Sequence, residues 1–452
     1  MIRDTILSLT LLTLTIPALA LAQPASQAEQ AAKGRFLGLQ QAIEAGLQHH
    51  PLIQEANAGL LASSAKTDQV RSLYYPQVYA NADGSAGSGR INPRFVTPAG
   101  GLLQPNLSSY TAGLLASQRI YDFGFTQNLV ESSEYGERAH EQEVTARRAR
   151  VTVEVQRSYL NSLKRQQLVR IAEETVRERG IIAGQIETLY RQQLKSKLDL
   201  NLVRLELVNA ESLLIRNRND LKASFSNLNR TMGIAGSDDY TLEDIDIDVA
   251  THRALGELIT DSLAHPELKR AKEQMAAAEA KKRAMKSQYL PTVSAIASGG
   301  YYDTFDSSRA VATGGWWAAG GLVSMPIFTG GLIENQVKEA AAQEAVALAH
   351  STSIEQALTE QVTNSYLDTV TFAQQIKLGQ ELVKTAQEAL SLAKQRYKLG
   401  LGSIIEVTQS EVGLTAAQTQ LAEAQYDYKI AEVTLAYAAG TSVRLQVDPI
   451  VR

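Results

Sequence analysis

The 452-residue chain contains no cysteine. This absence excludes disulfide bonds, thiolate metal sites, a cysteine nucleophile and a thioether lipid anchor. The chain also lacks a large excess of either charge, because 44 Lys and Arg residues stand against 48 Asp and Glu residues, a net charge of −4. Nucleic-acid-binding proteins are usually clearly basic, so we expect no nucleic-acid partner. With 20% charged residues, the chain is not a bundle of membrane helices.

Sequence signatures of catalysis are missing as well. The six histidines form no H-E-x-x-H pattern, and the sequence contains neither a G-x-S-x-G motif nor a P-loop. A glycine-rich stretch begins at Gly84, but no helix is predicted directly after it, so it does not resemble a phosphate-binding loop. We therefore expect a protein that is not an enzyme and binds no cofactor or metal.

The segment 1–22 has the composition of a secretory signal peptide. A short charged start is followed by an apolar stretch that ends in Ala20-Leu21-Ala22, the small-x-small pattern of a cleavage site. We expect cleavage after Ala22 and a mature protein outside the cytoplasm, since Pro17 and the small residues do not suit a membrane anchor. No later run of about 18 apolar residues occurs, so any membrane crossing must be made by β-strands.

The chain repeats itself at two constant offsets in sequence number. His50-Pro51 and Tyr74-Tyr75-Pro76 recur as His265-Pro266 and Tyr289-Leu290-Pro291, both at an offset of 215. Further on the offset is 207, which relates Ile120–Gly124 to Ile327–Gly331 and Gly233 to Gly440. A loop shortened by eight residues explains the change. The pattern predicts a first repeat at 23–233, a link at 234–254, a second repeat at 255–440 and a tail at 441–452.

Each repeat is expected to begin with a helix and continue in a β-hairpin. The helices start at Pro51 and Pro266, at a first-turn position that suits proline. The hairpins, about 76–123 and 291–328, are indicated by apolar or small residues that alternate with polar ones, such as Val78, Ala80, Ala82 and Gly84. Polar, glycine-rich segments at about 88–107 and 304–313 predict the hairpin loops.

A coiled-coil hairpin is predicted to follow each β-hairpin, at about 126–231 and 333–438. The descending arms, about 126–190 and 333–397, contain no proline and would each be roughly 95 Å long as helices. The returning arms place apolar residues at alternating spacings of three and four, which indicates an antiparallel coiled coil. The seam of the first descending arm comprises Val169, Ala172, Val176, Ala183, Ile186 and Tyr190.

Two β-hairpins cannot cross a bilayer alone, because an open sheet leaves unpaired backbone groups in hydrocarbon. Closed membrane barrels need about eight strands or more, so the four strands of one chain must be shared. A small and polar inward face suits a water-filled lumen, which favours three chains and twelve strands over two chains and eight. The predicted fold is an α+β membrane protein, a trimeric 12-stranded β-barrel continued by an α-helical coiled-coil barrel.

The proline-led helices, the strand starts at Tyr75-Pro76 and Leu290-Pro291, the Ile120–Gly124 and Ile327–Gly331 turns and the Tyr397-Lys398-Leu399-Gly400 tip together resemble the TolC-like outer-membrane efflux family. The resemblance covers essentially the whole mature chain. It implies a homotrimer in the outer membrane of a Gram-negative-type cell, extending into the periplasm. It also implies two partners, a periplasmic adaptor (membrane fusion) protein and an inner-membrane transporter. The channel itself would be a passive efflux conduit.

The resemblance also implies a periplasmic gate. The first acidic position of the family's mouth falls on Glu406, whereas the second falls on Gln409. The arginine of the family's latch falls on Gly402 and its acidic partner on Asp199, so the latch as known cannot form. We expect Lys195 or Lys197 to pair with Glu406 instead. Tyr397 is a further gate candidate, although plain packing in the coiled-coil seam also explains it, and a solvated charge also explains Glu406.

The same resemblance places adaptor docking at the turns between the helical arms. These turns comprise Leu194, Ser196, Gly400, Leu401, Gly402 and Ser403, and the glycines also suit simple helix caps. In the link, the alternating aspartates of 244–248 predict an edge strand rather than a calcium site, because they lack the EF-hand spacing.

Three alternatives to an efflux duct remain. The chain could serve a type I protein secretion system, form a structural periplasmic coiled-coil rod, or be an unrecognised hydrolase. The rod leaves the four alternating strands unexplained. A lumen lined with small polar side chains carries no specific pocket, so the sequence does not identify the cargo.

Overall fold

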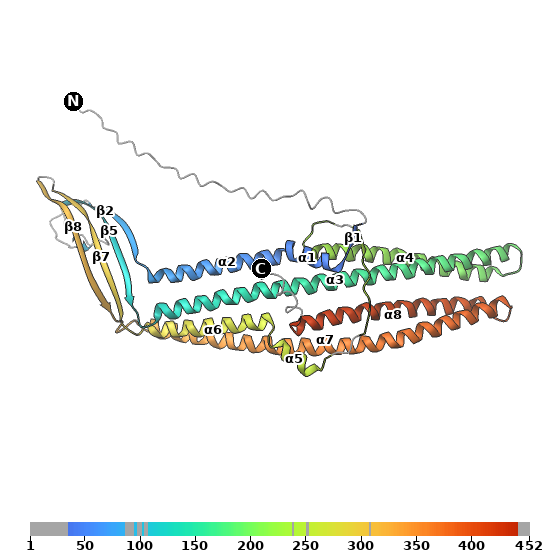
Figure 1. The fold of residues 1–452 in the computed structure, drawn as a ribbon. Coiled ribbons are helices and arrows are strands. Elements are labelled where there is room, and N and C mark those ends of the chain that lie inside the picture. The colour runs from blue at the N-terminus through green and yellow to red at the C-terminus, as the bar shows by residue number, and fades with distance from the viewer. Residues whose placement is uncertain are drawn as a thin grey trace, which may run out of the picture.

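The computed structural model describes residues 35–85, 95–96, 102–103, 107–236, 239–249, 253–306 and 309–441. The predicted signal peptide, 1–22, and nearly all of the predicted tail lie outside these residues. The molecule is elongated, with a β-sheet at one end and the turns of two long helical hairpins at the other (Figure 1). None of the helices in the described part of the chain contains an apolar stretch of the length that a membrane crossing requires.

Four antiparallel strands form the sheet, in the order β2 (Gln77–Ser85), β5 (Leu107–Tyr121), β7 (Thr292–Asp306) and β8 (Arg309–Ser324). Their register places the predicted apolar and small residues opposite one another on one face, for example Ala80, Leu114, Gly299 and Trp317. Asp83 and Thr111 pair on the other face. The predicted alternation is therefore confirmed. A small ladder joins β3 (Phe95–Val96) to β4 (Leu102–Leu103).

The predicted loop at 304–313 is wrong for most of its length. Strand β7 continues to Asp306 and β8 starts at Arg309, with a register shift beside Thr304. Thr304 and Phe305 are good strand formers, and the interstrand hydrogen bonds of a long hairpin outweigh the turn-like composition around them. Most of the other predicted loop, 88–107, lies outside the described residues.

The long predicted helices are confirmed almost residue for residue. Helices α3 (Phe125–Arg191) and α7 (Leu332–Lys398) have 67 residues each, which corresponds to a length of about 100 Å. They are followed by α4 (Lys197–Met232) and α8 (Ile404–Ala438), which return alongside them. Each long helix begins after a glycine with positive φ, Gly124 or Gly331, where the chain turns from strand to helix at no steric cost.

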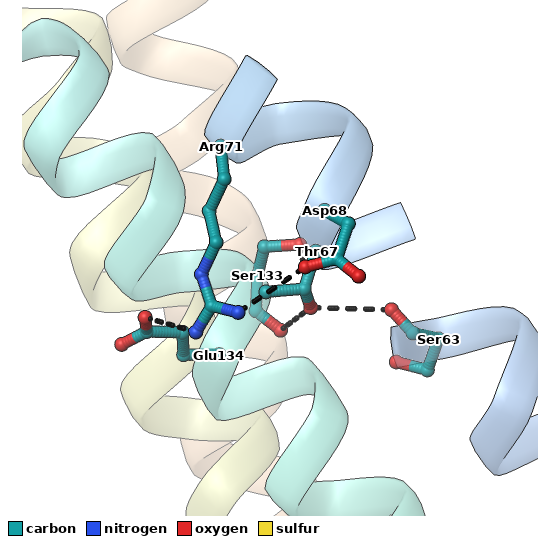
Figure 2. A network of polar contacts seen from close by, with 6 residues as sticks. All are labelled: Ser63, Thr67, Asp68, Arg71, Ser133 and Glu134. Carbon is teal, nitrogen blue, oxygen red and sulfur yellow. Dashed lines mark hydrogen bonds and ion pairs between the residues drawn. The ribbon is translucent and has the colours of Figure 1, made fainter. Parts of the chain in front are cut away.

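The short helices α2 (Pro51–Arg71) and α6 (Pro266–Ser287) lie beside the sheet-proximal halves of the long helices (Figure 1). Figure 2 shows how α2 is held on α3: the Arg71 guanidinium lies 2.9 Å from Glu134 on α3, and Asp68 of α2 itself lies 3.2 Å from the same group. The Thr67 hydroxyl donates to the Ser133 carbonyl on α3. Helix α6 packs between α3 and α7, so α3 has neighbours on both sides.

Halfway along the helices, a belt of small elements packs against two hydrophobic clusters, one that contains Tyr159 and one that contains Val362. It comprises β1 (Arg35–Leu37), α1 (Leu39–His49), the parallel partner strand β6 (Tyr240–Leu242) and α5 (Leu255–Ser262). The buried Tyr159 hydroxyl donates to the carbonyls of Leu37 and Glu243, at 2.8 and 2.9 Å. Burial raises the pKa of Tyr159 to about 12.

The predicted edge strand at 244–248 is wrong in position. The strand of this segment is β6, and residues 243–249 are neither helix nor strand. Tyr240 and Thr241 have higher strand propensity than the aspartates. Instead of pairing in a ladder, the Asp244 carboxylate accepts a hydrogen bond from the Tyr426 hydroxyl on α8, at 3.1 Å.

Candidate functional site

The turn between α3 and α4 carries the first group of candidate residues. Gln193 adopts a left-handed conformation with φ of 61°, and the Leu194 amide donates to the Leu189 carbonyl at 2.9 Å. Ser196 then caps α4: its hydroxyl accepts from the Asp199 amide at 3.1 Å, and the Asp199 carboxylate accepts from the Ser196 amide at 3.2 Å. This reciprocal capping box closes the turn tightly.

The turn between α7 and α8 repeats this geometry with different residues. Gly400 takes the left-handed position, with φ of 71°, and the Leu401 amide donates to the Arg396 carbonyl at 2.9 Å. Ser403 and Glu406 form the capping box of α8, at 3.3 and 3.4 Å. Asp199 and Glu406 are thus both helix-capping acids, whichever further role they have.

The ion pair of Glu406 differs from the one expected. Its carboxylate lies 3.5 Å from the Arg396 guanidinium on α7, and within the described chain it forms no ion pair with Lys195 or Lys197. The Lys195 ammonium instead lies 4.2 Å from the centre of the Tyr397 ring, a distance suited to a cation–π contact. Lys197 is exposed at the first residue of α4.

The two departures from the family pattern lie beside this arginine. A side chain at Gly402 would meet the Glu406 carboxylate at 3.0 Å and the Arg396 Cβ at 3.2 Å, so glycine leaves room for the pair. Gln409 lines an open groove with Arg396 and Glu406. A guanidinium is therefore present at this tip, although it comes from α7 and not from the turn.

Both tips are anchored in one apolar cluster. Its buried residues come from all four long arms: Ala183, Ile186, Leu200, Val203, Leu390, Ala393, Ile404 and Val407. Tyr397 packs against this cluster, and its buried hydroxyl has no hydrogen-bond partner among the described residues. Through Lys195 over its ring, Tyr397 also links the two turns.

A polar cluster above the tips escaped the sequence interpretation. Arg179 on α3 is buried and contacts Glu206 on α4 at 3.0 Å, while Glu411 on α8 is buried and lies 3.2 Å from Lys394 on α7. Burial raises the pKa of the Glu411 carboxyl above its ordinary value, and Lys394 partly opposes this shift. The available signal was Arg179 itself, which occupies the seam position between Val176 and Ala183.

Comparison with known proteins identifies the wider group. The sequence is 23% identical over 414 residues to the probable outer membrane lipoprotein SilC of Salmonella typhimurium, covering 86% of this chain and 85% of SilC. It is 24% identical over 406 residues to the toluene efflux pump outer membrane protein TtgC of Pseudomonas putida, covering 89% and 82%.

The fold matches a solved structure over a similar length. The outer membrane protein VceC of Vibrio cholerae superposes with a TM-score of 0.75 at 22% identity, covering 89% of this chain and 96% of VceC. The profile of the family described as outer membrane efflux protein matches residues 42–234 and 259–441. The chain therefore belongs to the outer membrane efflux protein family.

Proposed function

We propose that this protein is the outer-membrane exit duct of an efflux pump, assembled as a homotrimer. The observation that carries the proposal is a four-stranded sheet whose terminal strands, β2 and β8, lack a second neighbour among the described strands. One face of this sheet is apolar, with exposed Val78, Leu114 and Trp317. Such a sheet crosses a bilayer only when its edges are closed by other chains.

Three copies supply twelve strands, and the long helices continue the barrel into the periplasm. Since α3 and α7 are each about 100 Å long, they provide the length of a periplasmic tunnel. The proposal includes two structural repeats per chain, 23–233 and 255–440, joined by the link 234–254. It also includes cleavage of the signal peptide after Ala22 and, unlike the probable lipoprotein SilC, a mature protein without a lipid anchor, because the sequence has no cysteine.

Two partners complete the proposed pump, a periplasmic adaptor protein and an energised inner-membrane transporter. The adaptor docks at the turns, where Leu194 and Leu401 are exposed beside the capping serines Ser196 and Ser403. Gly400 and Gly402 flank Leu401 and carry no side chain that would cover it. The name of TtgC, a toluene efflux pump protein, supports an efflux role over protein secretion.

The outer-membrane duct is tested by fractionation and by electrical recording. The protein should enter the outer-membrane fraction, migrate as a heat-labile trimer on gels, and conduct ions in planar bilayers. Deletion of its gene should reduce export of several compounds from a panel of solvents, drugs, metals and bile salts. A mature protein that is monomeric and soluble without detergent would contradict the proposal.

We further propose that the gate at the periplasmic end comprises Tyr397, Lys195 and the Arg396–Glu406 pair. Glu406→Ala breaks this pair and should increase single-channel conductance and reduce cation selectivity. Asp199→Ala is the matched control, because it removes the equivalent capping box but no ion pair within the described chain. Equal recordings from both variants would restrict Glu406 to helix capping.

A further inference from the structure

The two halves of the chain correspond residue by residue. His50 and His265, related by the offset of 215, each accept a hydrogen bond at Nδ1 from the second amide of their helix, at 3.2 Å. Asn128 and Asn335, related by the offset of 207, each donate to the glycine carbonyl that precedes their helix, at 2.7 and 2.9 Å. Each residue of α2 therefore has a counterpart in α6, and each residue of α3 has one in α7.

Helices α2 and α6 have few charges in common. Most charged residues of one helix have an uncharged or oppositely charged counterpart in the other, and a charge of the same sign recurs at only two positions. The first position is held by Lys66 and Lys281, and the second by Arg71 and Lys286. The second position lies in the last turn of each helix, where the helix dipole favours a basic residue. The first position lies outside that turn, so the dipole does not explain its two lysines.

Lys66 and Lys281 do not hold the helices together. Both residues are exposed, and within the described ranges neither forms an ion pair or a side-chain hydrogen bond. Lys282, the next residue of α6, pairs instead with Glu344 on α7. The two recurring lysines therefore carry charges that no carboxylate of the same chain neutralises.

The belt marks one open face of the helical layer. Helices α2, α3, α6 and α7 lie side by side in that order, so each has one face toward the lumen of the proposed duct and one toward the outside. The belt covers the face of α3 that carries Tyr159, whose hydroxyl donates to the carbonyls of Leu37 and Glu243. Because a belt on the inner face would obstruct the duct, this face is the outer one.

The ion pair of Arg71 lies on the same outer face. Its partner Glu134, at 2.9 Å (Figure 2), precedes Tyr159 on α3 by 25 residues, which is about seven helical turns. Glu134 and Tyr159 are thus on one side of α3. By the correspondence of the halves, Lys286 takes the place of Arg71 on the outer side of α6.

Lys66 and Lys281 point to the opposite face. Each of them lies five residues before the basic residue of the last turn, Arg71 or Lys286. Five residues of an α-helix correspond to a rotation of about 140° about the helix axis. Since Arg71 and Lys286 lie on the outer face, this rotation directs Lys66 and Lys281 toward the lumen.

An independent contact gives the same orientation for α6. Ala277, one turn before Lys281, accepts a hydrogen bond at 2.8 Å from the Ser132 hydroxyl on α3. Ser132 precedes Tyr159 by 27 residues, which is about seven and a half turns, so it lies on the side of α3 away from the belt. The face of α6 that carries Ala277 and Lys281 is therefore the inner face.

We propose that Lys66 and Lys281 form a basic ring in the lumen, which favours the passage of small solutes that carry carboxylate or phosphate groups. Both lysines lie ten residues before the proline that precedes a strand of the sheet, Pro76 or Pro291, so they lie at one level. Three copies place six lysines there, and rings of Lys or Arg give pores a preference for anions. The inference rests on the proposed trimeric duct and adds the class of solute that it favours.

An acidic residue near this level does not cancel the ring. The counterpart of Ser132 on α7 is Glu339, so its carboxylate also lies on the inner face, where it accepts a hydrogen bond from Gln343 at 2.9 Å. Each copy thus contributes two lysines and one such carboxylate. The level keeps a net positive charge, although the whole chain has a net charge of −4.

Ion selectivity in planar bilayers tests the ring. The double variant Lys66→Gln with Lys281→Gln removes both charges and leaves polar side chains. The permeability ratio of K⁺ to Cl⁻, measured from the reversal potential in a KCl gradient near 0.1 M, should rise about twofold or more. In about 1 M KCl the difference should vanish, because the screening length falls from about 10 Å to about 3 Å.

A multivalent anion gives a second measurement. Citrate should collect at the ring and reduce the K⁺ current through the unmodified channel. The double variant should need about tenfold more citrate for the same reduction, because the local concentration of the anion falls with the positive charge.

Two matched variants control for the loss of charge as such. Lys272→Gln with Lys286→Gln removes the same charge from exposed residues of α6, but Lys272 lies 14 residues before Lys286, about four turns, and so shares its outer face. This variant should leave ion selectivity and citrate block unchanged. Lys66→Arg with Lys281→Arg keeps the charge and should retain the values of the unmodified channel.

The outcomes separate the ring from the duct. A change of selectivity in the inner double variant alone supports the ring. If the unmodified protein conducts, and the inner and outer variants differ from it equally or not at all, the ring is overturned and the duct remains. If the unmodified protein forms no channel, both proposals fail. Should the inner double variant not assemble as a trimer, the single variants decide, each with about half of the expected shift.

Discussion

Helices α3 and α7 have the same length, begin after the same kind of glycine turn and end in the same kind of capped hairpin. They differ in their surroundings, because α3 has helices on both sides and α7 has an open side (Figure 1). Val346 of α7 is 69% exposed, whereas its counterpart Ala139 of α3 is 3% exposed. The comparison teaches that corresponding helices of the two halves occupy different places: α3 lies at the centre of the chain and α7 at its border.

The largest expected effect separates chain folding from assembly. Ile171→Ala creates a cavity inside one chain and should lower the free energy of unfolding by about 2–5 kcal/mol, independently of protein concentration. Leu378→Ala, at the corresponding position of α7, should leave the single chain nearly unaffected. It should weaken the proposed trimer, so that the apparent unfolding midpoint of the variant falls on dilution.

Urea unfolding in detergent at several protein concentrations measures both effects. Ser353→Ala, a substitution elsewhere on α7, serves as the surface control. If the unfolding midpoints of Ile171→Ala and Leu378→Ala depended equally on protein concentration, the predicted difference between the central helix α3 and the border helix α7 would be contradicted.

The two helix-capping histidines, His50 and His265, allow the stability of the two halves to be compared as a function of pH. Burial lowers the pKa of both His50 and His265 below 6.5, and the cap requires an unprotonated Nδ1. The stability that they contribute is therefore fully present above pH 6.5 and is lost as the pH falls from there through the lowered pKa values. His265→Asn retains a capping acceptor that does not titrate, so the decline in stability below pH 6.5 should flatten.

Thermal unfolding between pH 7.5 and 5 measures this change, which we expect to be about 1 kcal/mol, the ordinary contribution of a helix cap. His140→Asn, at a histidine that caps no helix, is the control. An unchanged pH profile in His265→Asn would show that this cap does not contribute to acid sensitivity.

The smallest expected effect concerns the two tips. Gln193 holds the left-handed conformation that Gly400 holds at the other tip, and a residue with a side chain is strained there by about 1 kcal/mol. Gln193→Gly should therefore stabilise the α3–α4 turn by about 0.5–1 kcal/mol, and Gly400→Gln should destabilise the α7–α8 turn by a similar amount. Hydrogen exchange of the first amides of α4 and α8 reports each change locally. Exchange rates that change in the same direction in both variants would contradict this account.

Local patterns predicted most of the secondary structure. Pro51, Pro266 and the period-two alternation are signals contained in a few residues, and the structure confirms the helices and strands that they predict. The loop at 304–313 was mispredicted because the pairing of β7 with β8 outweighs its turn-like composition. The strand at 244–248 was mispredicted because strand pairing there depends on β1, a partner segment far away in the chain. The Arg179 cluster was missed because its four charged residues, Arg179, Glu206, Lys394 and Glu411, lie on four different helices.

In the candidate site, too, some contacts can be predicted from the sequence and others cannot. The capping boxes of Asp199 and Glu406 follow from the Ser-x-x-acid spacing alone. The partner of Glu406 does not, since Arg396 lies ten residues earlier on the preceding helix. In the sequence, Gly402 stands where the family's latch has an arginine. In the structure, the absence of a side chain at Gly402 leaves space for the Arg396–Glu406 pair.

The amino-acid sequence by itself determined the elements, their lengths, their apolar faces and the resemblance of the two halves, because these depend on contacts between residues close in the chain. Only the tertiary structure decided which half is central and which is at the border, and with which partner each tip charge pairs. Packing brings together residues hundreds of positions apart, and no local periodicity contains that information.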